Sequence, residues 1–481
     1  MNSRKLTATI ALVTAIGCTP PPPEQQFLTD ALTALGGRSR IEAAKTLVIE
    51  GKGVNYNLGQ DMKPEAATQT FEITGYLRTI DIANRRQRIE QTRTPKFAYF
   101  QGPQPQTQIQ ALDSDVAFNV NPAGEAARAA AAVETDRRFD IYHHPLALLR
   151  AAIDTKSNVT NVRSIGAVRQ ADIITAAGIG LTMTIDAAGL PLSISSKADN
   201  ANLGDVVLTT TFADYQDVKG LKLPAHFTGK VDAFTTWDIQ AATQTLDAEV
   251  GDLAAPAAVA SKPAPAAAPN VTAEQVGKGV WFLAGQSHHS VLIEFADHLM
   301  LIEAPQSEAR TLAVIAKAQQ TVPGKPLTQL VTTHHHFDHT AGMRAAIAEG
   351  LTVITQAGNK EWVENMARRP HTFHPDTLAK NVSRLNVETV DEDKEYQDQS
   401  MTVMLYHVAG NPHSDTMLMA YIPRDKILVE ADAFSPGSAV QPYAANLLEN
   451  IQKRNLRVDK IVPLHGAIAP FAELTKTVGA K

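Results

Sequence analysis

The chain has 481 residues, of which 44% are hydrophobic and 20% are charged, and its formal net charge is −6 at pH 7. A chain of this length exceeds one ordinary hydrophobic core and predicts two folded domains, or three. Its 44 Lys and Arg and 50 Asp and Glu residues form no long block of one sign, which argues against a nucleic-acid partner. No apolar run approaches the roughly 20 residues that cross a bilayer as a helix.

The N-terminal sequence MNSRKLTATIALVTAIGC has the layout of an export signal. Two cations, Arg4 and Lys5, precede an apolar stretch, and small residues follow just before Cys18. Residues 1–18 resemble a bacterial lipoprotein signal, which implies a lipid on Cys18 that anchors the protein to a membrane of the bacterial cell envelope. We expect it to face the periplasm, with the outer membrane favoured over the inner. The alternative is a conventional signal that is cut elsewhere. The proline-rich residues 19–26 would form a stiff spacer.

A change in composition divides the rest of the chain. Residues 251–270 contain almost only Ala, Pro and small polar residues, which predicts an exposed linker. The linker separates an N-terminal domain, residues 27–250, from a C-terminal domain, residues 271–481, so we expect an α+β protein of two domains. In the N-terminal domain, apolar and polar residues alternate between turn-forming residues, a pattern typical of antiparallel strands. We predict a mainly antiparallel sheet that curls over one or two helices.

Two phrases of the N-terminal domain, IDAAGLP and DYQDVKGLKLP, are similar to periplasmic lipoprotein-carrier domains, in which a half-barrel shelters acyl chains. That resemblance implies a domain that binds an apolar ligand and catalyses nothing. His143 and His144 stand directly before Pro145 and the predicted helix PLALLRAAID. We interpret them as a surface pair at a helix start, not as a metal site.

The stretch THHHFDHTAG, residues 333–342, holds four histidines and one aspartate within six consecutive positions. The run PLTQLVTT before it is apolar and β-branched, which predicts a buried strand. The sequence DHTAGMRAAIAEG after it predicts a helix that ends at Gly350. The histidines are therefore expected in a strand-to-helix loop.

The spacing within this stretch suits metal ligands. His334 and His336 are two residues apart, so at a strand end both side chains point to the same side. Asp338 and His339 turn into the loop, where they can face a second ion. His335 lies between the two ligands and points elsewhere.

Three further candidates follow later in the chain. His413 lies in the loop GNPHSDT, Asp432 ends the buried run KILVEADAF, and His465 ends the run DKIVPLHG. We expect all three at strand ends, where the loops of a sheet collect functional groups. Taken alone, His413 or His465 fits a structural histidine equally well, but together with the cluster they predict a metal centre.

Residues 276–470, through these motifs, resemble the metallo-β-lactamase superfamily. The resemblance implies an αβ/βα sandwich, in which two mixed sheets lie face to face with helices outside and a binuclear metal site lies at one rim. The ligands that it implies are His334, His336 and His413 for one ion, Asp338, His339 and His465 for the other, and Asp432 as the bridge between them.

The same resemblance addresses a neighbouring acid and the metal. Glu303, in LIEAP, stands where the family commonly has Asp, and it would orient a ligand histidine from outside. Imidazole and carboxylate ligands without a thiolate suit zinc best, with iron and manganese as alternatives. In di-iron relatives an acidic residue usually replaces the histidine at the position of His336, so this chain favours hydrolysis over redox chemistry.

The implied mechanism is attack by a hydroxide that two zinc ions share and that Asp338 orients. Strict β-lactamases of the family usually lack the bridging aspartate, whereas its esterases and lactonases usually have it. Asp432 therefore favours an envelope hydrolase of a small ester, lactone or related acyl compound. The alternatives are a metallo-β-lactamase that acts on lactam antibiotics, and an envelope lipoprotein that binds lipid, with an accessory metallo domain. His288 and His289, on an early loop, are candidates for substrate contact, against a solvated loop.

Overall fold

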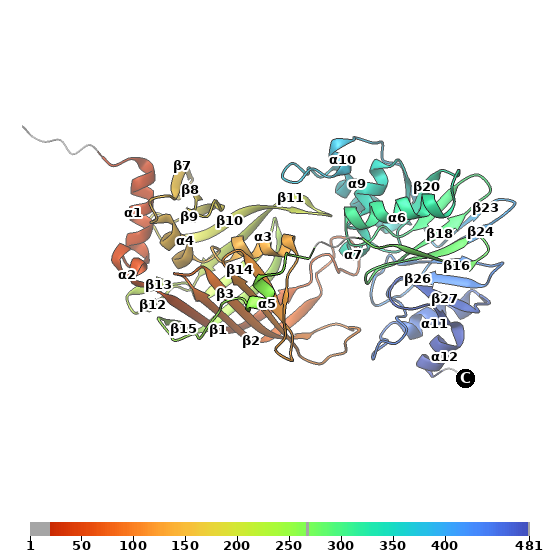
Figure 1. Cartoon of the computed structure of the whole chain (residues 1–481), viewed down its shortest axis with the longest axis horizontal. Helices are drawn as coiled ribbons and strands as arrows, with labels where there is room; N and C mark the ends of the chain where they lie inside the picture. Colours follow the sequence, from red (N-terminus) through yellow and green to blue (C-terminus); the bar gives the residue numbers. More distant parts are fainter. Residues whose placement is uncertain (1–19, 266–268, 480–481) are drawn as a thin grey trace, which may run out of the picture.

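The computed structural model describes residues 20–265 and 269–479, so Cys18 and the predicted export signal lie outside the described residues. Figure 1 shows an elongated molecule with two domains side by side along its long axis. The N-terminal domain ends with strand β15 (Phe234–Leu246), and the C-terminal domain begins with β16 (Thr272–Gly277). Within the described ranges, no helix combines the length and the apolar character that crossing a membrane requires.

A single sheet of 13 strands makes up most of the N-terminal domain. All of its neighbouring strands pair antiparallel. In spatial order the strands are β6 (Ala126–Arg128), β5 (Val116–Val120), β4 (Gln106–Asp113), β3 (Arg86–Pro95), β2 (Thr70–Asp81), β1 (Thr46–Tyr56), β15, β14 (His226–Val231), β11 (Gly204–Ala213), β10 (Pro191–Asn200), β9 (Gly180–Ile185), β8 (Val168–Ile174) and β7 (Asn158–Ile165). A separate small hairpin pairs β12 (Gln216–Val218) with β13 (Leu221–Leu223).

Helices fill the concave side of this sheet. They are α1 (Pro23–Leu35), α2 (Arg38–Ala43), α3 (Ala131–Asp140) and α4 (Pro145–Ala152). The buried faces of α1 and α4 join residues of the sheet in one hydrophobic core, which confirms the predicted antiparallel sheet over helices, although α2 and α3 exceed the one or two helices expected. Helix α1 begins with Pro23, whose fixed φ suits a first turn, so residues 23–26 belong to the helix and not to the expected spacer.

His143 and His144 start helix α4 as predicted, but the interpretation as a surface pair is wrong. Their exposed fractions are only 5% and 0%. The ring of His143 hydrogen-bonds the hydroxyls of Thr210 (3.0 Å) and Ser196 (2.9 Å), while Nδ1 of His144 accepts from the backbone N–H of Leu146. The pair is buried because α4 lies inside the curve of the sheet.

The Ala/Pro segment between the domains is less exposed than its composition predicts. Helix α5 (Ala257–Ala260) forms within it, and Val259 packs against Phe118 of the sheet. Leu253 is also buried, and Arg128 donates a hydrogen bond to the carbonyl of Lys262 (3.0 Å). The segment therefore packs in part against the N-terminal domain.

The C-terminal domain contains two mixed sheets. The first comprises β16, β17 (Val280–Ala284), β18 (Ser290–Glu294), β19 (Leu299–Ile302), β20 (Leu327–Val331), β21 (Thr352–Gln356) and β22 (Val387–Val390). The second comprises β23 (Asp393–Gln397), β24 (Thr402–His407), β25 (Leu418–Ile422), β26 (Ile427–Glu430), β27 (Lys460–Pro463) and β28 (Ala469–Pro470). The helical segments are α6 (Glu308–Thr321), α7 (Phe337–Thr340), α8 (Met343–Ala348), the 3-10 turn Ala357–Asn359, α9 (Lys360–Arg368), α10 (Thr377–Lys380), α11 (Ala444–Lys453) and α12 (Phe471–Val478).

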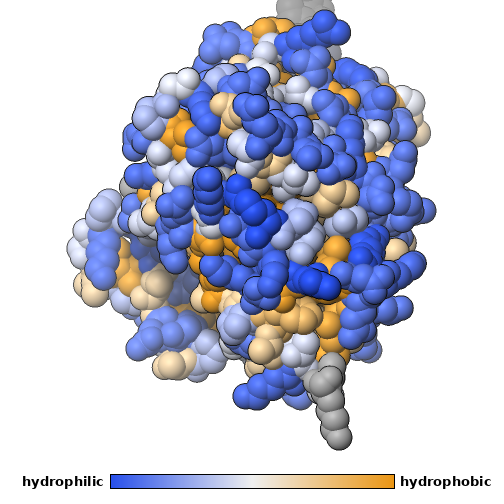
Figure 2. Space-filling view, turned by 90° about the vertical axis from the view of Figure 1, so that its right-hand side faces the viewer, coloured by the Kyte–Doolittle hydropathy of each residue, from blue (hydrophilic) through white to orange (hydrophobic). Residues whose placement is uncertain are grey.

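Three hydrophobic layers hold these elements together. One lies between the two sheets, one between the first sheet and the helices that include α6, α8 and α9, and one between the second sheet and α11 and α12. This arrangement confirms the predicted αβ/βα sandwich. The end of the molecule that this domain forms is mostly hydrophilic, with only small apolar patches (Figure 2).

Candidate metal centre

Loops at one rim of the sandwich carry the predicted ligands. The stretch from His334 to His339 leads from β20 into the short helix α7, as the sequence predicts. His413 lies in the turn between β24 and β25, Asp432 follows β26, and His465 follows β27. Parts of the chain that are far apart in sequence therefore meet at this rim.

The candidate ligand atoms form two compact groups. Within each group, one nitrogen or carboxylate oxygen from every residue lies within 4.8 Å of the others. The first group is His334, His336, His413 and Asp432, and the second is His288, Asp338, His339 and His465. The structure thus brings together every residue that was predicted as a ligand, and it adds His288 to the second group.

Asp432 connects the two groups. Its Oδ2 lies 2.9 Å from Nε2 of His413 and 3.5 Å from Nε2 of His334. Its Oδ1 lies 3.0 Å from Nε2 of His465, and Oδ2 is also 3.2 Å from Nε2 of His339. The backbone of Asp432 has φ 59°, a conformation that is uncommon outside glycine and clusters at functional sites. This carboxylate is placed as a bridging ligand would be.

Four ring nitrogens of the first group are buried and make no hydrogen bond of acceptable geometry, although Nε2 of His413 lies 2.9 Å from the Asp432 carboxylate. They are Nε2 of His334, Nδ1 of His336 and both ring nitrogens of His413. An unpaired buried polar atom costs about 1–3 kcal/mol, so its persistence calls for a partner such as an ion. On His334 and His336 the other nitrogen is engaged, by the Thr333 hydroxyl (3.0 Å) and by the Asp61 carbonyl (2.9 Å). These residues fit a metal ion that takes imidazole and carboxylate donors.

The protonation states agree with that fit. Burial lowers the pKa of His334 to about 3 and also holds the pKa of His336 well below its ordinary range, so both rings are neutral and able to coordinate. Burial opposes charge on His339 too, but the carboxylates of Asp432 and Glu303 outweigh it and raise its pKa well above the ordinary value. This part of the site therefore favours a positive charge.

Glu303 makes the contact expected of a residue that orients a ligand histidine. Its Oε2 accepts a hydrogen bond from Nδ1 of His339 at 2.7 Å, and its Oε1 accepts one from the backbone N–H of Thr333 at 2.6 Å. The Glu303 side chain is fully buried, and its backbone has φ 75°. The acid thus ties the loop to the ring that faces Asp432.

The two early histidines differ in position. His288 places Nε2 3.2 Å from Oδ2 of Asp338, and its ring lies 3.9 Å from the ring of His465. His289 turns away, because its Nδ1 accepts from the N–H of Gly285 (3.2 Å) and its ring packs on Phe282. Neither histidine is among the residues that line the cavity at the site. A substrate contact by either of them stays a prediction.

A cavity of about 580 Å³ opens beside the cluster, and both domains line it. Asp338, His413, Asp432 and His465 form one side, while loops of the N-terminal domain form the other. Sequence reasoning missed this second side. One signal for it exists, because the segment KFAYF, residues 96–100, gathers three aromatic side chains in a loop.

Fold and site together define a sandwich domain built around a candidate metal centre. Residues 284–465 match the family model of the metallo-beta-lactamase superfamily, and this part of the chain belongs to that superfamily, as its motifs implied. Among solved structures, a metallo-beta-lactamase from Pontibacter korlensis has 18% identity over 44% of this chain and 98% of its own, with a TM-score of 0.33. One from Hirschia baltica has 17% identity over 44% and 96%, with a TM-score of 0.35. FIM-1 from Pseudomonas aeruginosa, in a mono-zinc form, has 16% identity over 44% and 93%, with a TM-score of 0.35.

Proposed function

We propose that the protein is a metal-dependent hydrolase that holds two zinc ions and cleaves a small ester, lactone or related acyl compound. The observation that carries the proposal is that buried nitrogens of His334, His336 and His413, which lack a hydrogen bond, gather with a carboxylate oxygen of Asp432 within 4.8 Å of one another. Zinc ions, when bound, polarise a carbonyl oxygen and lower the pKa of a coordinated water to about 7. The remaining chemistry depends on how the chain holds its own groups.

Asp338 is held so that it can orient a water. Its Oδ1 accepts a hydrogen bond from Nε2 of Gln60 at 2.7 Å, and its Oδ2 lies 3.2 Å from Nε2 of His288. Burial opposes its ionisation, but the neighbouring His339 and the hydrogen bond from His288 outweigh this and hold the pKa of Asp338 well below its usual range. The carboxylate is therefore ionised at neutral pH and can accept a hydrogen bond from a water beside it, which would orient that water.

The turn that carries Asp432 is fixed from behind. Oε2 of the buried Glu430 accepts hydrogen bonds from the backbone N–H groups of Ala433 (3.0 Å) and Phe434 (3.1 Å). Burial raises the pKa of Glu430 to about 8. A rigid turn keeps the Asp432 carboxylate between the two histidine groups, which suits a site that must hold its geometry while a substrate reacts.

The test is metal content and turnover of the purified protein. Elemental analysis should give close to two zinc per chain, and a panel of esters, lactones, thioesters, phosphodiesters and a chromogenic lactam should give turnover of an ester or lactone. Preferential turnover of the lactam would favour the antibiotic-cleaving alternative. Metal-free protein without turnover, even after zinc is added back, would reject the hydrolase.

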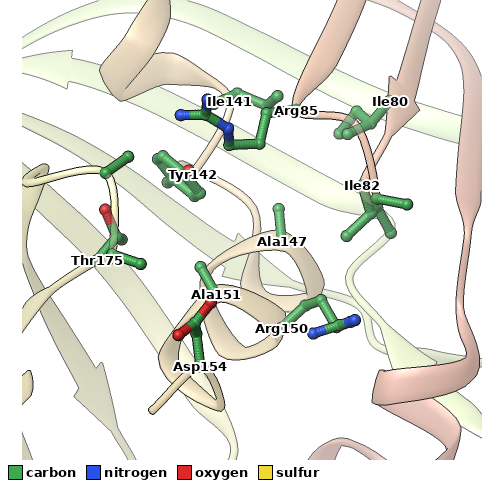
Figure 3. Close-up of a pocket in the computed structure, with 13 residues that line it drawn as sticks. Ile80, Ile82, Arg85, Ile141, Tyr142, Ala147, Arg150, Ala151, Asp154 and Thr175 are labelled. Carbon is green, nitrogen blue, oxygen red and sulfur yellow. The ribbon is translucent and has the colours of Figure 1, made fainter. Parts of the chain in front are cut away.

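A second candidate function is the binding of an amphiphilic ligand by the N-terminal domain. A hollow of about 400 Å³ there is lined by apolar side chains that include Ile80, Ile82 and Tyr142, and its wall also carries two cations, Arg85 and Arg150, and one carboxylate, Asp154 (Figure 3). Such a wall suits an acyl chain with an acidic end. Native mass spectrometry of the purified protein should then show a co-purified lipid, and a ligand-free spectrum would argue against this function.

The anchoring of the protein is a further part of the proposal, and it is supported by the sequence around Cys18. A lipid on that cysteine would place the enzyme in the bacterial envelope, facing the periplasm. Cell fractionation should find the full chain with membranes and a Cys18→Ser variant in the soluble fraction. Equal distribution of the two would leave the lipoprotein interpretation without support.

A further inference from the structure

The N-terminal domain reaches into the candidate metal centre through the β1–β2 loop, residues 57–69. Nε2 of Gln60 donates to Oδ1 of Asp338 at 2.7 Å, and the carbonyl of Asp61 accepts from Nε2 of His336 at 2.9 Å. One residue of each candidate ligand group is thus held by this loop. The contact on His336 also fixes which nitrogen carries the proton, and it leaves Nδ1 free to face the site.

A glycine seats this loop against helix α7. Gly59 has φ +81°, and its carbonyl accepts from the backbone N–H of Phe337 at 3.1 Å. A Cβ at Gly59 would lie 2.3 Å from Cγ of the Phe337 ring, so no other residue fits without moving the loop or the ring. Because Phe337 directly precedes Asp338, the loop packs tightly on the segment that carries the ligands.

A second contact fixes how the domains lie. The β10–β11 hairpin extends toward the segment that follows α9 (Figure 1). There the carboxylate of Asp205 accepts hydrogen bonds from the backbone N–H of Thr372 (2.8 Å) and from its hydroxyl (2.6 Å). Arg369 pairs with Asp232 at 3.0 Å and donates to the carbonyl of Leu203. Because two separate contacts join the domains, the β1–β2 loop is held in a fixed position at the site.

A second loop of the N-terminal domain, the β3–β4 loop (residues 96–105), brings aromatic rings to the same cavity. The rings of Phe97 and Tyr99 pack edge to face, with their centroids 5.5 Å apart. The ring of Phe100 lies 6.0 Å from that of His413 and 5.2 Å from that of Tyr443. The Tyr443 hydroxyl also donates to the carbonyl of Ala98 in this loop. An apolar wall therefore stands directly beside a candidate ligand.

We propose that the N-terminal domain completes the metal centre and selects the substrate. The β1–β2 loop positions His336 and Asp338, and the Phe97, Tyr99 and Phe100 rings receive an apolar, planar group attached to the carbonyl that reacts. Among the described residues that line this cavity there is neither Lys nor Arg, so a substituent that lies on the wall gains from being uncharged. The substrate class deepens the proposed hydrolase function and rests on it.

The positioning role is tested by metal affinity, which needs no turnover. In the full chain, Gly59→Ala should raise the zinc dissociation constant, measured by chelator competition, about 10- to 100-fold. Gly124→Ala is the matched control, because Gly124 has φ +86° and nothing lies within 4 Å of its Cβ position. Equal affinities in the two variants would overturn the role.

A second, milder variant separates a loss of zinc affinity from a loss of fold stability, which Gly59→Ala alone does not do. Gln60→Ala leaves the backbone free of strain, and it should weaken zinc binding about 3- to 10-fold while the metal-free protein unfolds at the wild-type temperature. A lower unfolding temperature with unchanged zinc affinity would mean that Gln60 only stabilises the fold, and the positioning role would fall.

The aromatic wall is tested by binding of uncleaved amides to the zinc-loaded full chain. N-methylbenzamide should bind about 10-fold more tightly than N-methylacetamide, because a ring on the wall adds apolar contact. Phe100→Ala should remove most of this preference, and Ile165→Ala, which truncates an exposed apolar side chain, should keep it. Equal affinity of the wild type for the two amides, or a full preference for N-methylbenzamide in Phe100→Ala, would overturn the proposed role of the aromatic rings in binding. If the preference holds while no ester or lactone is cleaved, the proposed hydrolase activity fails and the binding role of the rings is retained.

Discussion

His143 in the N-terminal domain and His334 in the C-terminal domain are both buried, yet their ring nitrogens are used differently. Both nitrogens of His143 meet hydroxyl groups, whereas Nε2 of His334 has no hydrogen-bond partner and lies 3.5 Å from Asp432. His144 also leaves Nε2 unpaired, but its ring lies against that of Phe227. A buried histidine is thus an ordinary structural element. What distinguishes the candidate metal centre is that several unpaired nitrogens gather around one shared carboxylate.

The largest expected effect comes from removing that shared carboxylate. Asp432→Asn keeps the shape of the side chain but removes the charge between the two histidine groups, so at least one zinc should be lost. We expect kcat/KM to fall on the order of 10³-fold, which corresponds to about 4 kcal/mol. Elemental analysis and steady-state kinetics measure both quantities. His335→Gln, a change at a neighbouring buried histidine outside both groups, should retain the metal. A wild-type zinc content in Asp432→Asn would show that the shared carboxylate is not what distinguishes this site from a structural histidine such as His143.

His143, whose ring is hydrogen-bonded to two hydroxyl groups, should make the free energy of unfolding depend on pH. Burial lowers the pKa of His143 from the ordinary histidine value of about 6.5 to about 4, with a smaller opposing effect from Asp140. The folded state therefore binds fewer protons than the unfolded state at mildly acidic pH. The resulting stabilisation is complete above pH 6.5 and disappears as the pH falls toward 4, by about 3 kcal/mol.

Hydrogen exchange of the β10 and β11 peptides between pH 4 and 7 measures this change once intrinsic rates are corrected. His143→Gln cannot take up the proton, so its protection should fall less steeply below pH 6.5 than that of the wild type. The neighbouring His144, whose pKa burial also holds well below its ordinary value, contributes a remaining slope. Identical slopes in wild type and variant would show that His143 does not control acid stability.

A smaller effect, on zinc affinity, should follow from substitution of Glu303, the acid that hydrogen-bonds His339. Glu303→Gln retains a hydrogen-bonding group at His339 but removes the negative charge that supports it. Zinc affinity should fall about 10- to 100-fold, or about 1.4–2.7 kcal/mol. Glu303→Asp, which keeps the negative charge on a shorter side chain, should lose less. Chelator competition measures the series, and a greater loss in Glu303→Asp than in Glu303→Gln would place the function of this residue in its length instead of its charge.

The residues that gather at the rim of the C-terminal domain are those that the sequence singles out, because each of them follows a strand. Spacing alone predicts that His334 and His336 share a side, whereas the meeting of the whole set at one rim was implied by the resemblance to the superfamily. The burial of His143 is not predictable in this way, because it depends on how far the 13-stranded sheet curves, and that curvature is the sum of many small twists.

Other features leave no periodic signal. Helix α3 has no apolar stripe, and its Arg137 is instead held by hydrogen bonds to the carbonyls of Ala111 (3.0 Å) and Phe118 (2.6 Å). Gln60 and Asp61 are ordinary loop residues by composition, and only the docking of two domains gives them neighbours at the site. Contacts between domains follow from surface shape, which local patterns do not encode.

The hydrogen bond from His336 to the Asp61 carbonyl joins residues 275 positions apart in the chain. Contacts of such separation close late in folding, since the intervening chain must be ordered first. If the chain holds zinc as proposed, full affinity for the ion is reached only after the entire polypeptide has folded and its halves have joined. Retention of the ion would then report on the quality of assembly, and partly folded or truncated chains would release it to the surrounding medium.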